Sequence, residues 1–175
     1  MIILVLGPNG SGKSMYAEKI AAGFSTPSLY YIATMIPFGD EGKARVDKHK
    51  KQRMVYDFVT VERPFGVSEI PIPSDSVVLL EDVSNMLGNV LFSGEQDGNE
   101  DSVFDDIRAL CAKCRACVFV SIDGLTVQLE YNEETRGYID ALSRLNRRLS
   151  DFADVVIQMQ NGNPVFLKGE FHAMD

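Results

Sequence analysis

The sequence predicts a three-layer α/β domain built around a mostly parallel central sheet. Apolar runs rich in Val, Ile and Leu do not alternate with polar residues, which is typical of parallel strands buried on both faces. Helical patterns lie between these runs, and a repeated strand–helix order is typical of this architecture. The chain of 175 residues is long enough for one sizeable core, so we expect a single domain over residues 1–175.

The strands are expected where the apolar runs are bounded by turn residues. A last, short strand is expected after the turn Asn161-Gly162-Asn163, because such a turn joins antiparallel strands. In order along the chain, the expected strands are residues 2–6, 28–33, 76–81, 116–122, 154–159 and 164–167.

The first expected helix directly follows a glycine-rich loop, and the second is highly charged and expected to be exposed. In the last helix, Tyr138, Leu142, Leu145 and Leu149 recur at helical spacing and predict a buried stripe. The expected helices are residues 14–24, 41–53, 83–92, 103–113 and 133–152. Residues 63–73 and 93–101 are expected to be loops, and the tail 169–175 is expected to be frayed.

Composition excludes some classes of partner. The net charge of −8 and the pI near 4.8 argue against a nucleic acid or an anionic membrane as the main partner. No segment approaches the roughly 18 consecutive apolar residues of a membrane span. The first residues, MIILVLG, lack a basic region and lead into a glycine loop, so we interpret them as a buried strand and expect a cytoplasmic protein.

The three cysteines form a C-x-x-C-x-x-C run, namely Cys111, Cys114 and Cys117. Such spacing can place thiolates around zinc or an iron–sulfur cluster. A complete site needs a fourth ligand, however, and His49 and His172 are distant in sequence. We therefore favour the interpretation that the first two cysteines end a helix and the third begins a buried strand.

The strongest motif is GPNGSGKS, which fits the pattern G-x-x-x-x-G-K-[ST] of a phosphate-binding loop, or P-loop. It lies between an expected strand and an expected helix, as the motif requires. The glycines let backbone N–H groups surround phosphate oxygens, and the helix N-terminus favours the same anion. The motif predicts a RecA-like P-loop NTPase that binds ATP or GTP, with Lys13 on the β- and γ-phosphates and Ser14 on Mg²⁺. The nucleotide-binding residues of this loop are Gly7, Pro8, Asn9, Gly10, Ser11, Gly12, Lys13 and Ser14.

A magnesium site also needs a carboxylate near Ser14. Glu81 and Asp82 follow an apolar strand and should reach the carboxyl edge of the sheet, where open α/β sheets bind ligands. Acidic residues also stabilise a helix N-terminus, which is the alternative role of this pair. We expect one of the two to serve the metal.

Several further motifs occur in the same order as in a known family. They are YIAT at 31–34 with its preceding Tyr30, D-E-x-x-x-R-V-x-x-H-K-x-x-R at 40–53, F-x-T-x-E at 58–62, LLEDVSNMLGNVLF at 79–92, and an element from Asp140 to Lys168. In these motifs the chain resembles the bifunctional adenosylcobinamide kinase/adenosylcobinamide-phosphate guanylyltransferases of cobalamin biosynthesis.

The resemblance implies two reactions. A nucleoside triphosphate phosphorylates the hydroxyl of the aminopropanol arm of adenosylcobinamide, and a histidine then accepts GMP from GTP and passes it to the new phosphate. The matching histidine is His49, flanked by Lys48, Lys50 and Lys51. The lysines would attract phosphate and favour the neutral, nucleophilic imidazole. An exposed residue on a basic helix is the alternative interpretation of His49.

The resemblance also implies further contacts and a homotrimer in which the histidine helix of one subunit lies near a neighbour's site. Arg45 and Arg53 are candidate phosphate clamps, since a guanidinium matches phosphate oxygens. A surface arginine of the helix is the alternative interpretation of each. The implied nucleotide contacts outside the loop are Ala33, Thr34, Lys50, Arg53, Glu62 and Glu81.

One segment departs from the family pattern. The chain has Ser121-Ile122-Asp123-Gly124-Leu125 where the family usually has N-E-[VI]-G after the fourth strand, and the residues up to Tyr131 replace a proline-containing stretch. Two alternatives therefore stay open: a diverged P-loop kinase of another small molecule without guanylyl transfer, and a non-catalytic nucleotide-dependent binding module.

Overall fold

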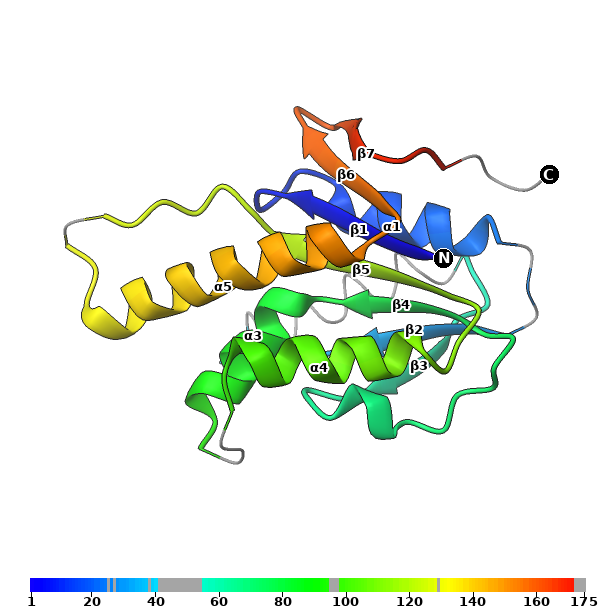
Figure 1. Cartoon of the computed structure of the whole chain (residues 1–175), viewed down its shortest axis with the longest axis horizontal. Helices are drawn as coiled ribbons and strands as arrows, with labels where there is room; N and C mark the ends of the chain where they lie inside the picture. Colours follow the sequence, from blue (N-terminus) through cyan, green and yellow to red (C-terminus); the bar gives the residue numbers. More distant parts are fainter. Residues whose placement is uncertain are drawn as a thin grey trace.

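A seven-stranded sheet forms the centre of the computed structural model, which describes residues 1–24, 26, 28–37, 39–40, 55–94, 98–128 and 130–171 (Figure 1). The strand order is β3-β2-β4-β5-β1-β6-β7. All neighbouring strands are parallel except β6 and β7, which form an antiparallel hairpin, so the predicted mostly parallel sheet is confirmed. The strands are β1 (Ile2–Gly7), β2 (Leu29–Ala33), β3 (Val59–Glu62), β4 (Val77–Glu81), β5 (Ala116–Ile122), β6 (Val155–Gln160) and β7 (Asn163–Lys168).

Three of the described helices begin at polar caps, and the first follows a glycine. Asn132 accepts a hydrogen bond from the Thr135 N–H, and Asn99 forms a capping box with Ser102. The helix with this capping box begins at Glu100. The expected start at residue 103 is therefore three residues too late, and the expected loop through residue 101 is too long. The described helices are α1 (Lys13–Ala22), α3 (Val83–Phe92), α4 (Glu100–Cys111) and α5 (Glu133–Phe152), with a 3₁₀ turn, η1 (Val67–Glu69). The predicted helix 41–53 lies outside the described residues.

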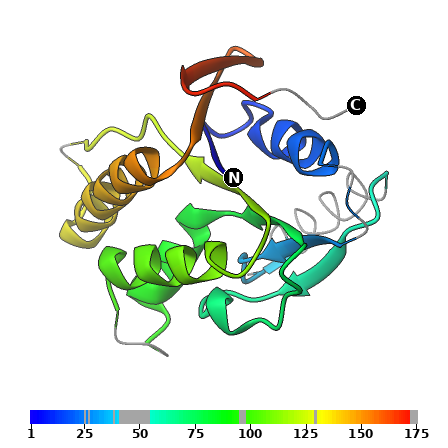
Figure 2. The same cartoon turned by 45° about the vertical axis from the view of Figure 1, so that its right-hand side comes forward.

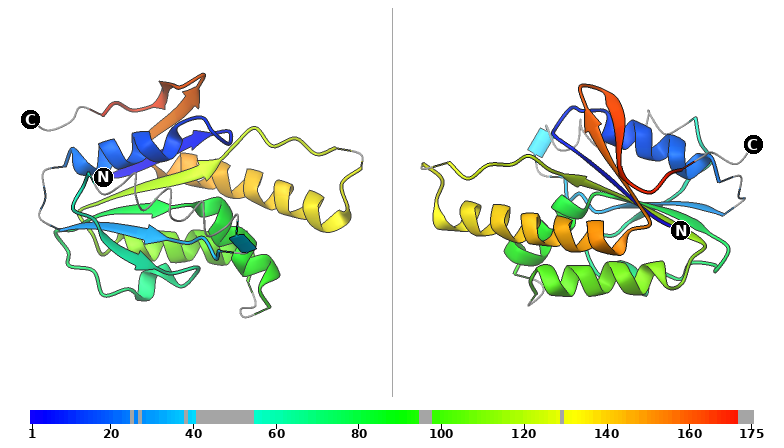
Figure 3. Two further views of the ribbon diagram at one scale, coloured as in Figure 1. Left: turned by 180° about the vertical axis from the view of Figure 1, so that it is seen from behind. Right: turned by 45° about the horizontal axis from the view of Figure 1, so that its top comes forward.

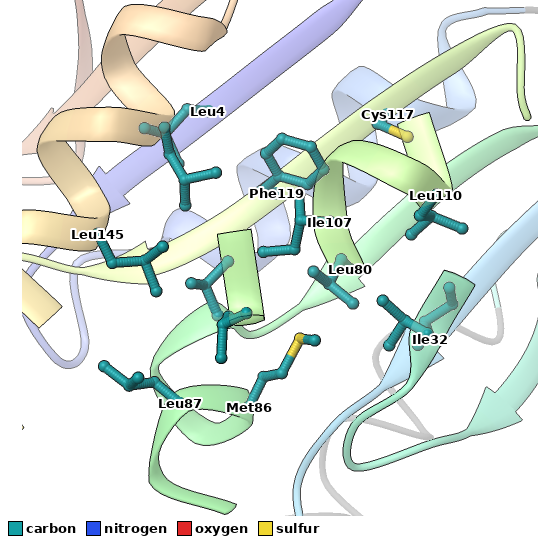
Figure 4. Packing of buried hydrophobic residues seen from close by; sticks show 14 of the residues in the cluster. Leu4, Ile32, Leu80, Met86, Leu87, Ile107, Leu110, Cys117, Phe119 and Leu145 are labelled. Carbon is teal, nitrogen blue, oxygen red and sulfur yellow. The ribbon is translucent and has the colours of Figure 1, made fainter. Parts of the chain in front are cut away.

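The sheet separates two apolar cores. On one face α1 packs through Ala17 and Ile20, whereas α3, α4 and α5 cover the opposite face (Figure 2). Successive residues of β4 point to opposite cores, as strand geometry requires: Leu79 joins the α1 side and Leu80 joins the other. Figure 4 shows the larger core, in which side chains from α3, α4 and α5 meet those of the central strands.

The buried stripe predicted on α5 is largely confirmed. Leu142, Leu145 and Leu149 are fully buried, and Tyr138 is partly buried with its hydroxyl donating to the Ser84 carbonyl. Among the described residues, no helix is both long and apolar enough to cross a membrane.

The last described residue, Phe171, packs its ring on Phe24, with ring centroids 5.3 Å apart. The fraying expected for residues 169–175 stays a prediction. Residues 172–175, including His172, lie outside the described residues. The hairpin of β6 and β7 folds back at one edge of the sheet (Figure 3).

Candidate functional site

The loop from Gly7 to Ser14 joins β1 to α1 at the carboxyl edge of the sheet. Gly10 and Gly12 have φ values of 75° and 84°, a region that side chains other than glycine rarely adopt. Gly12 is also the N-cap of α1, so the loop runs directly onto the positive end of a ten-residue helix. A phosphate is the kind of anion that such a loop and helix end can bind.

Gly7 is required for a different reason, namely close packing. A Cβ at this position would lie 2.5 Å from the Ser11 Oγ and 3.1 Å from the Met159 Cβ. The end of β1 therefore lies too close to the loop and to β6 for a side chain.

Lys13 is held beneath the loop. Its side chain is buried, and its Nζ donates to the Pro8 carbonyl oxygen at 3.4 Å. The same carbonyl accepts the Ser11 N–H at 3.2 Å. The lysine charge is thus fixed next to the backbone that would surround a phosphate.

Ser14 and Glu81 connect the loop to β4. The Ser14 hydroxyl donates to Glu81 Oε1, and Glu81 Oε2 is buried without a hydrogen-bond partner among the described residues. The pKa of Glu81 is raised to about 8, chiefly by burial and also by the nearby carboxylates of Asp82 and Glu18, while the hydrogen bond from Ser14 and the charge of Lys13 act in the opposite direction. An unsatisfied buried carboxylate oxygen is costly, so this position suits a cation.

The donor set fits magnesium. Mg²⁺ prefers oxygen ligands and usually keeps waters and substrate phosphates, with only one or two protein side chains. A hydroxyl and a carboxylate in contact meet this requirement. No group of three or more His, Cys, Asp or Glu side chains able to hold a metal occurs among the described residues. Ser14 and Glu81 are the side chains that would hold Mg²⁺.

Asp82 and Thr34 have structural contacts here. Asp82 Oδ1 accepts the Asn85 N–H at 2.6 Å and so caps α3, which is the alternative role considered from sequence. The fully buried Thr34 hydroxyl donates to the Asp82 carbonyl at 2.7 Å and accepts the Asp82 N–H at 2.8 Å. This pair of bonds fixes the end of β4 beside the end of β2.

Ala33 lies between two glutamates. In the sheet register, Ala33 is opposite Glu62 on β3 and opposite Glu81 on β4. Neighbouring strands are about 4.8 Å apart, so the three residues form a short row across the carboxyl edge. The small side chain of Ala33 separates the exposed Glu62 from the partly buried Glu81.

Two polar side chains, Asp123 after β5 and Gln158 on β6, lie beside the phosphate loop. The Asp123 N–H donates to the Gly7 carbonyl at 3.3 Å, and Asp123 Oδ2 accepts from Gln158 Nε2 at 2.7 Å. Behind it, Asn146 of α5 binds the Ser121 hydroxyl at 2.7 Å and the Ile122 carbonyl at 2.8 Å. Asp123 is therefore held in place next to the loop by partners from two elements.

Comparison with known proteins decides the family. Residues 3–167 match the family model described as CobU, cobinamide kinase/cobinamide phosphate guanyltransferase. The chain belongs to this family. The resemblance noted from the sequence motifs is thereby confirmed, and the match makes the chain a member of a transferase family of cobalamin biosynthesis.

The fold of this CobU-family chain is similar to that of other P-loop proteins. It superposes on the flagellar accessory protein FlaH of Methanocaldococcus jannaschii with a TM-score of 0.54 at 15% identity, covering 98% of this chain and 82% of FlaH. An ATPase from the type III secretion system of pathogenic bacteria gives a TM-score of 0.53 at 13% identity, covering 91% of this chain and 51% of the ATPase. At such identities the likeness shows the fold alone, a RecA-like P-loop NTPase. No curated protein matches the chain significantly.

The structure brings together most of the residues expected at the site. The phosphate loop, Ala33, Thr34, Glu62, Glu81 and Asp82 all lie at or beside the carboxyl edge of the sheet. The expected histidine helix is outside the described residues, so His49, Lys50, Arg53 and Arg45 stay predictions.

Sequence reasoning missed two site neighbours. Gln158 lies opposite Leu6 in the register of β6 with β1, and Glu18 is buried on α1 one turn after Ser14. The helical spacing of four from Ser14 could have indicated Glu18. Gln158 could not have been found from local sequence, because its position depends on how β6 pairs.

Proposed function

We propose that this CobU-family chain phosphorylates adenosylcobinamide with ATP or GTP and then converts the product to adenosylcobinamide-GDP with GTP. The family match supports the general reactions, and the observation that carries the kinase step is the Ser14–Glu81 contact at the end of a complete phosphate loop.

In the kinase step, the hydroxyl oxygen of the aminopropanol arm attacks the γ-phosphorus. The bond to the β–γ bridging oxygen breaks, the nucleoside diphosphate leaves, and the hydroxyl proton is released. The residues of the loop bind the phosphates, and Lys13 compensates their negative charge. Ser14 and Glu81 hold Mg²⁺, which supplies charge neutralisation when bound. Ala33, Thr34 and Glu62 border the nucleotide on the β2–β3 side.

In the guanylyl step, an imidazole nitrogen of His49 attacks the α-phosphorus of GTP and pyrophosphate leaves. A phosphate oxygen of adenosylcobinamide phosphate then attacks the phosphorus of the histidine–GMP intermediate, and the imidazole leaves. A neutral imidazole is a competent nucleophile near its usual pKa of about 6.5. Lys50 and Arg53 are proposed to bind phosphate oxygens during both transfers.

The decisive experiment is label transfer. The protein is incubated with Mg²⁺ and GTP that is labelled at the α-phosphate, and protein-bound label is measured after acid and after alkali. A phosphoramidate gives acid-labile, alkali-stable label. We expect label on the wild type, none on His49→Ala, and release of the label by adenosylcobinamide phosphate.

His172→Ala is the matched control, because His172 is the only other histidine of the chain. It should label like the wild type. Absence of label on a wild-type protein that binds GTP would exclude the histidine–GMP intermediate. Label that persists in His49→Ala would place the intermediate on another residue.

A kinase without guanylyl transfer is the second candidate. It is favoured by the departure from the family pattern at Asp123, which lies against the phosphate loop. This candidate predicts ATP consumption that depends on an alcohol substrate, with no labelled protein. A binding module would consume no nucleotide with any corrinoid.

The proposal also includes assembly and location. The family resemblance supports a homotrimer in the cytoplasm, acting on small molecules rather than on nucleic acid. Sedimentation equilibrium of the full chain tests the trimer, and a monomer that retains full guanylyl transfer would contradict it.

A further inference from the structure

Two thiols meet at the amino edge of the sheet, opposite the phosphate loop. Cys114 lies in the turn after α4, and Cys117 is the second residue of β5. Their Sγ atoms are 3.1 Å apart. Figure 4 shows Cys117 at the margin of the larger core, where α4 ends near Leu110.

The two thiols differ in environment. Cys117 is 1% exposed, whereas Cys114 is only partly buried. The Cys117 thiol hydrogen-bonds to the Cys114 sulfur and lowers the pKa of Cys114, while hydrogen bonds to Cys111 and Cys114 and burial raise the pKa of Cys117. Cys114 is thus the accessible member that ionises first, and Cys117 is protected behind it.

We propose that Cys114 and Cys117 form a reversible dithiol–disulfide pair that is oxidised by low-molecular-weight disulfides such as oxidised glutathione. A disulfide has an S–S bond of about 2.05 Å, so the sulfurs need to approach by about 1 Å. Cys117 is fixed in β5 by pairing with Ile2 and Val78, whereas Cys114 lies in the turn before the strand, so the movement falls to Cys114.

The reaction balances with one molecule of oxidised glutathione. The Cys114 thiolate attacks one glutathione sulfur, forms a mixed disulfide and releases the first glutathione thiolate. The Cys117 sulfur then attacks the Cys114 sulfur, loses its proton to solvent and displaces the second glutathione. The two cysteines lose two electrons and two protons, and the glutathione disulfide is reduced to two thiols.

The pair is separate from the nucleotide site. Cys117 is paired with Ile2 at the start of β1, and Ile122 with Gly7 at its end. Five residues at about 3.3 Å each place the two edges about 16 Å apart. Oxidation should therefore leave nucleotide affinity unchanged, and nucleotide binding serves as the control for correct folding.

Cys111 is the competing partner, because its thiol also interacts with Cys117. Trypsin separates the three cysteines: cleavage after Arg108, Lys113, Arg115 and Arg136 yields peptides 109–113, 114–115 and 116–136. The folded protein is incubated with oxidised glutathione, free thiols are blocked with N-ethylmaleimide, and the digest is analysed by mass spectrometry without reductant.

We expect peptide 114–115 linked to peptide 116–136, lost after dithiothreitol and retained in Cys111→Ser. In Cys114→Ser the linkage should disappear, with nucleotide binding intact. The same incubation of the urea-unfolded chain should give mixed pairings, because the native geometry is lost. Three blocked thiols in the folded wild type, or a dominant link between peptides 109–113 and 116–136, would overturn the proposal.

Discussion

The Ser14 hydroxyl donates a hydrogen bond to the buried carboxylate of Glu81, and this contact ties the first turn of α1 to the end of β4. The two residues are 67 positions apart in the sequence. Ser14 would contribute a hydroxyl oxygen to the proposed cation site, and Glu81 would contribute a carboxylate oxygen. The contact makes Ser14 and Glu81 an interdependent pair.

Ser14→Ala and Glu81→Gln should each weaken Mg²⁺-dependent nucleotide binding by about 10- to 100-fold, as for other residues that support a metal. The double variant should lose less nucleotide affinity than the product of the two single fold losses, because both residues serve one ion. Calorimetric titration with a non-hydrolysable ATP analogue, with and without Mg²⁺, measures this coupling. Asp75→Asn, just before the opposite end of β4, is the control and should bind normally. Fully multiplicative losses would contradict a shared ion.

Lys13→Met should lower nucleotide affinity by about 10- to 100-fold, since a charge-assisted hydrogen bond contributes about 1.5–3 kcal/mol. The exposed Lys19→Met on the same helix removes an equal charge away from the loop and should have little effect. Fluorescence titration with a labelled nucleotide distinguishes the two. Equal losses in both variants would indicate a general charge effect instead of a phosphate contact.

Gly7→Ala and Gly137→Ala should change stability in opposite directions. At Gly7 a Cβ meets the Ser11 Oγ and the Met159 Cβ, so we expect a loss of about 1–3 kcal/mol in the free energy of unfolding. At Gly137, inside α5, a Cβ meets nothing within 4 Å, so a gain of about 0.5–1 kcal/mol is expected from helix propensity. Urea denaturation measures both. A stable Gly7→Ala variant would show that Ser11 moves away freely.

We expect Glu100 to make a pH-dependent contribution to the free energy of unfolding. The hydrogen bond from Arg144 holds the pKa of Glu100 below its usual 4.5. The stabilisation is therefore present above the unfolded-state pKa and is lost as pH falls through the lower folded-state pKa. Because Arg144 is more than half exposed, Glu100→Gln should cost only about 0.5 kcal/mol near neutral pH. Urea midpoints at neutral and at acidic pH check this.

Glu134→Gln, an exposed glutamate in the first turn of α5, is the matched control for a helix-end charge. The difference in urea midpoint between Glu100→Gln and the wild type should be smaller in acid. An equal difference in acid and at neutral pH would contradict the ion-pair explanation. High salt should also reduce the difference.

Much of the fold could be predicted from sequence because its signals are local. The apolar run of β5 was predicted with the bounds that the structure shows, and so were α3 and α5. The complete loop motif likewise identified the position of Lys13 and Ser14. The edge strand β3 was different: its four residues are mostly exposed, and only the family motif F-x-T-x-E indicated it.

The rest depended on contacts between distant segments. Strand order decides that Gln158 and Asp123 meet beside Gly7, and no local pattern contains that order. Glu81 and Asp82 are adjacent, yet Glu81 contacts Ser14 whereas Asp82 caps α3. Which residue takes which role depends on how the end of β4 is oriented. The ring contact between Phe171 and Phe24 likewise joins distant segments, and the tail sequence alone did not reveal it.

The separation of the two cores by the sheet also determines which backbone amides exchange hydrogen by local unfolding and which only by global unfolding. Amides of β1 lie between both cores and within two parallel ladders, so they can exchange hydrogen with solvent only when the whole domain unfolds. Every residue of β7 is exposed and paired on one side to β6. Its amides can exchange through local fraying, which leaves the sheet and the phosphate loop folded.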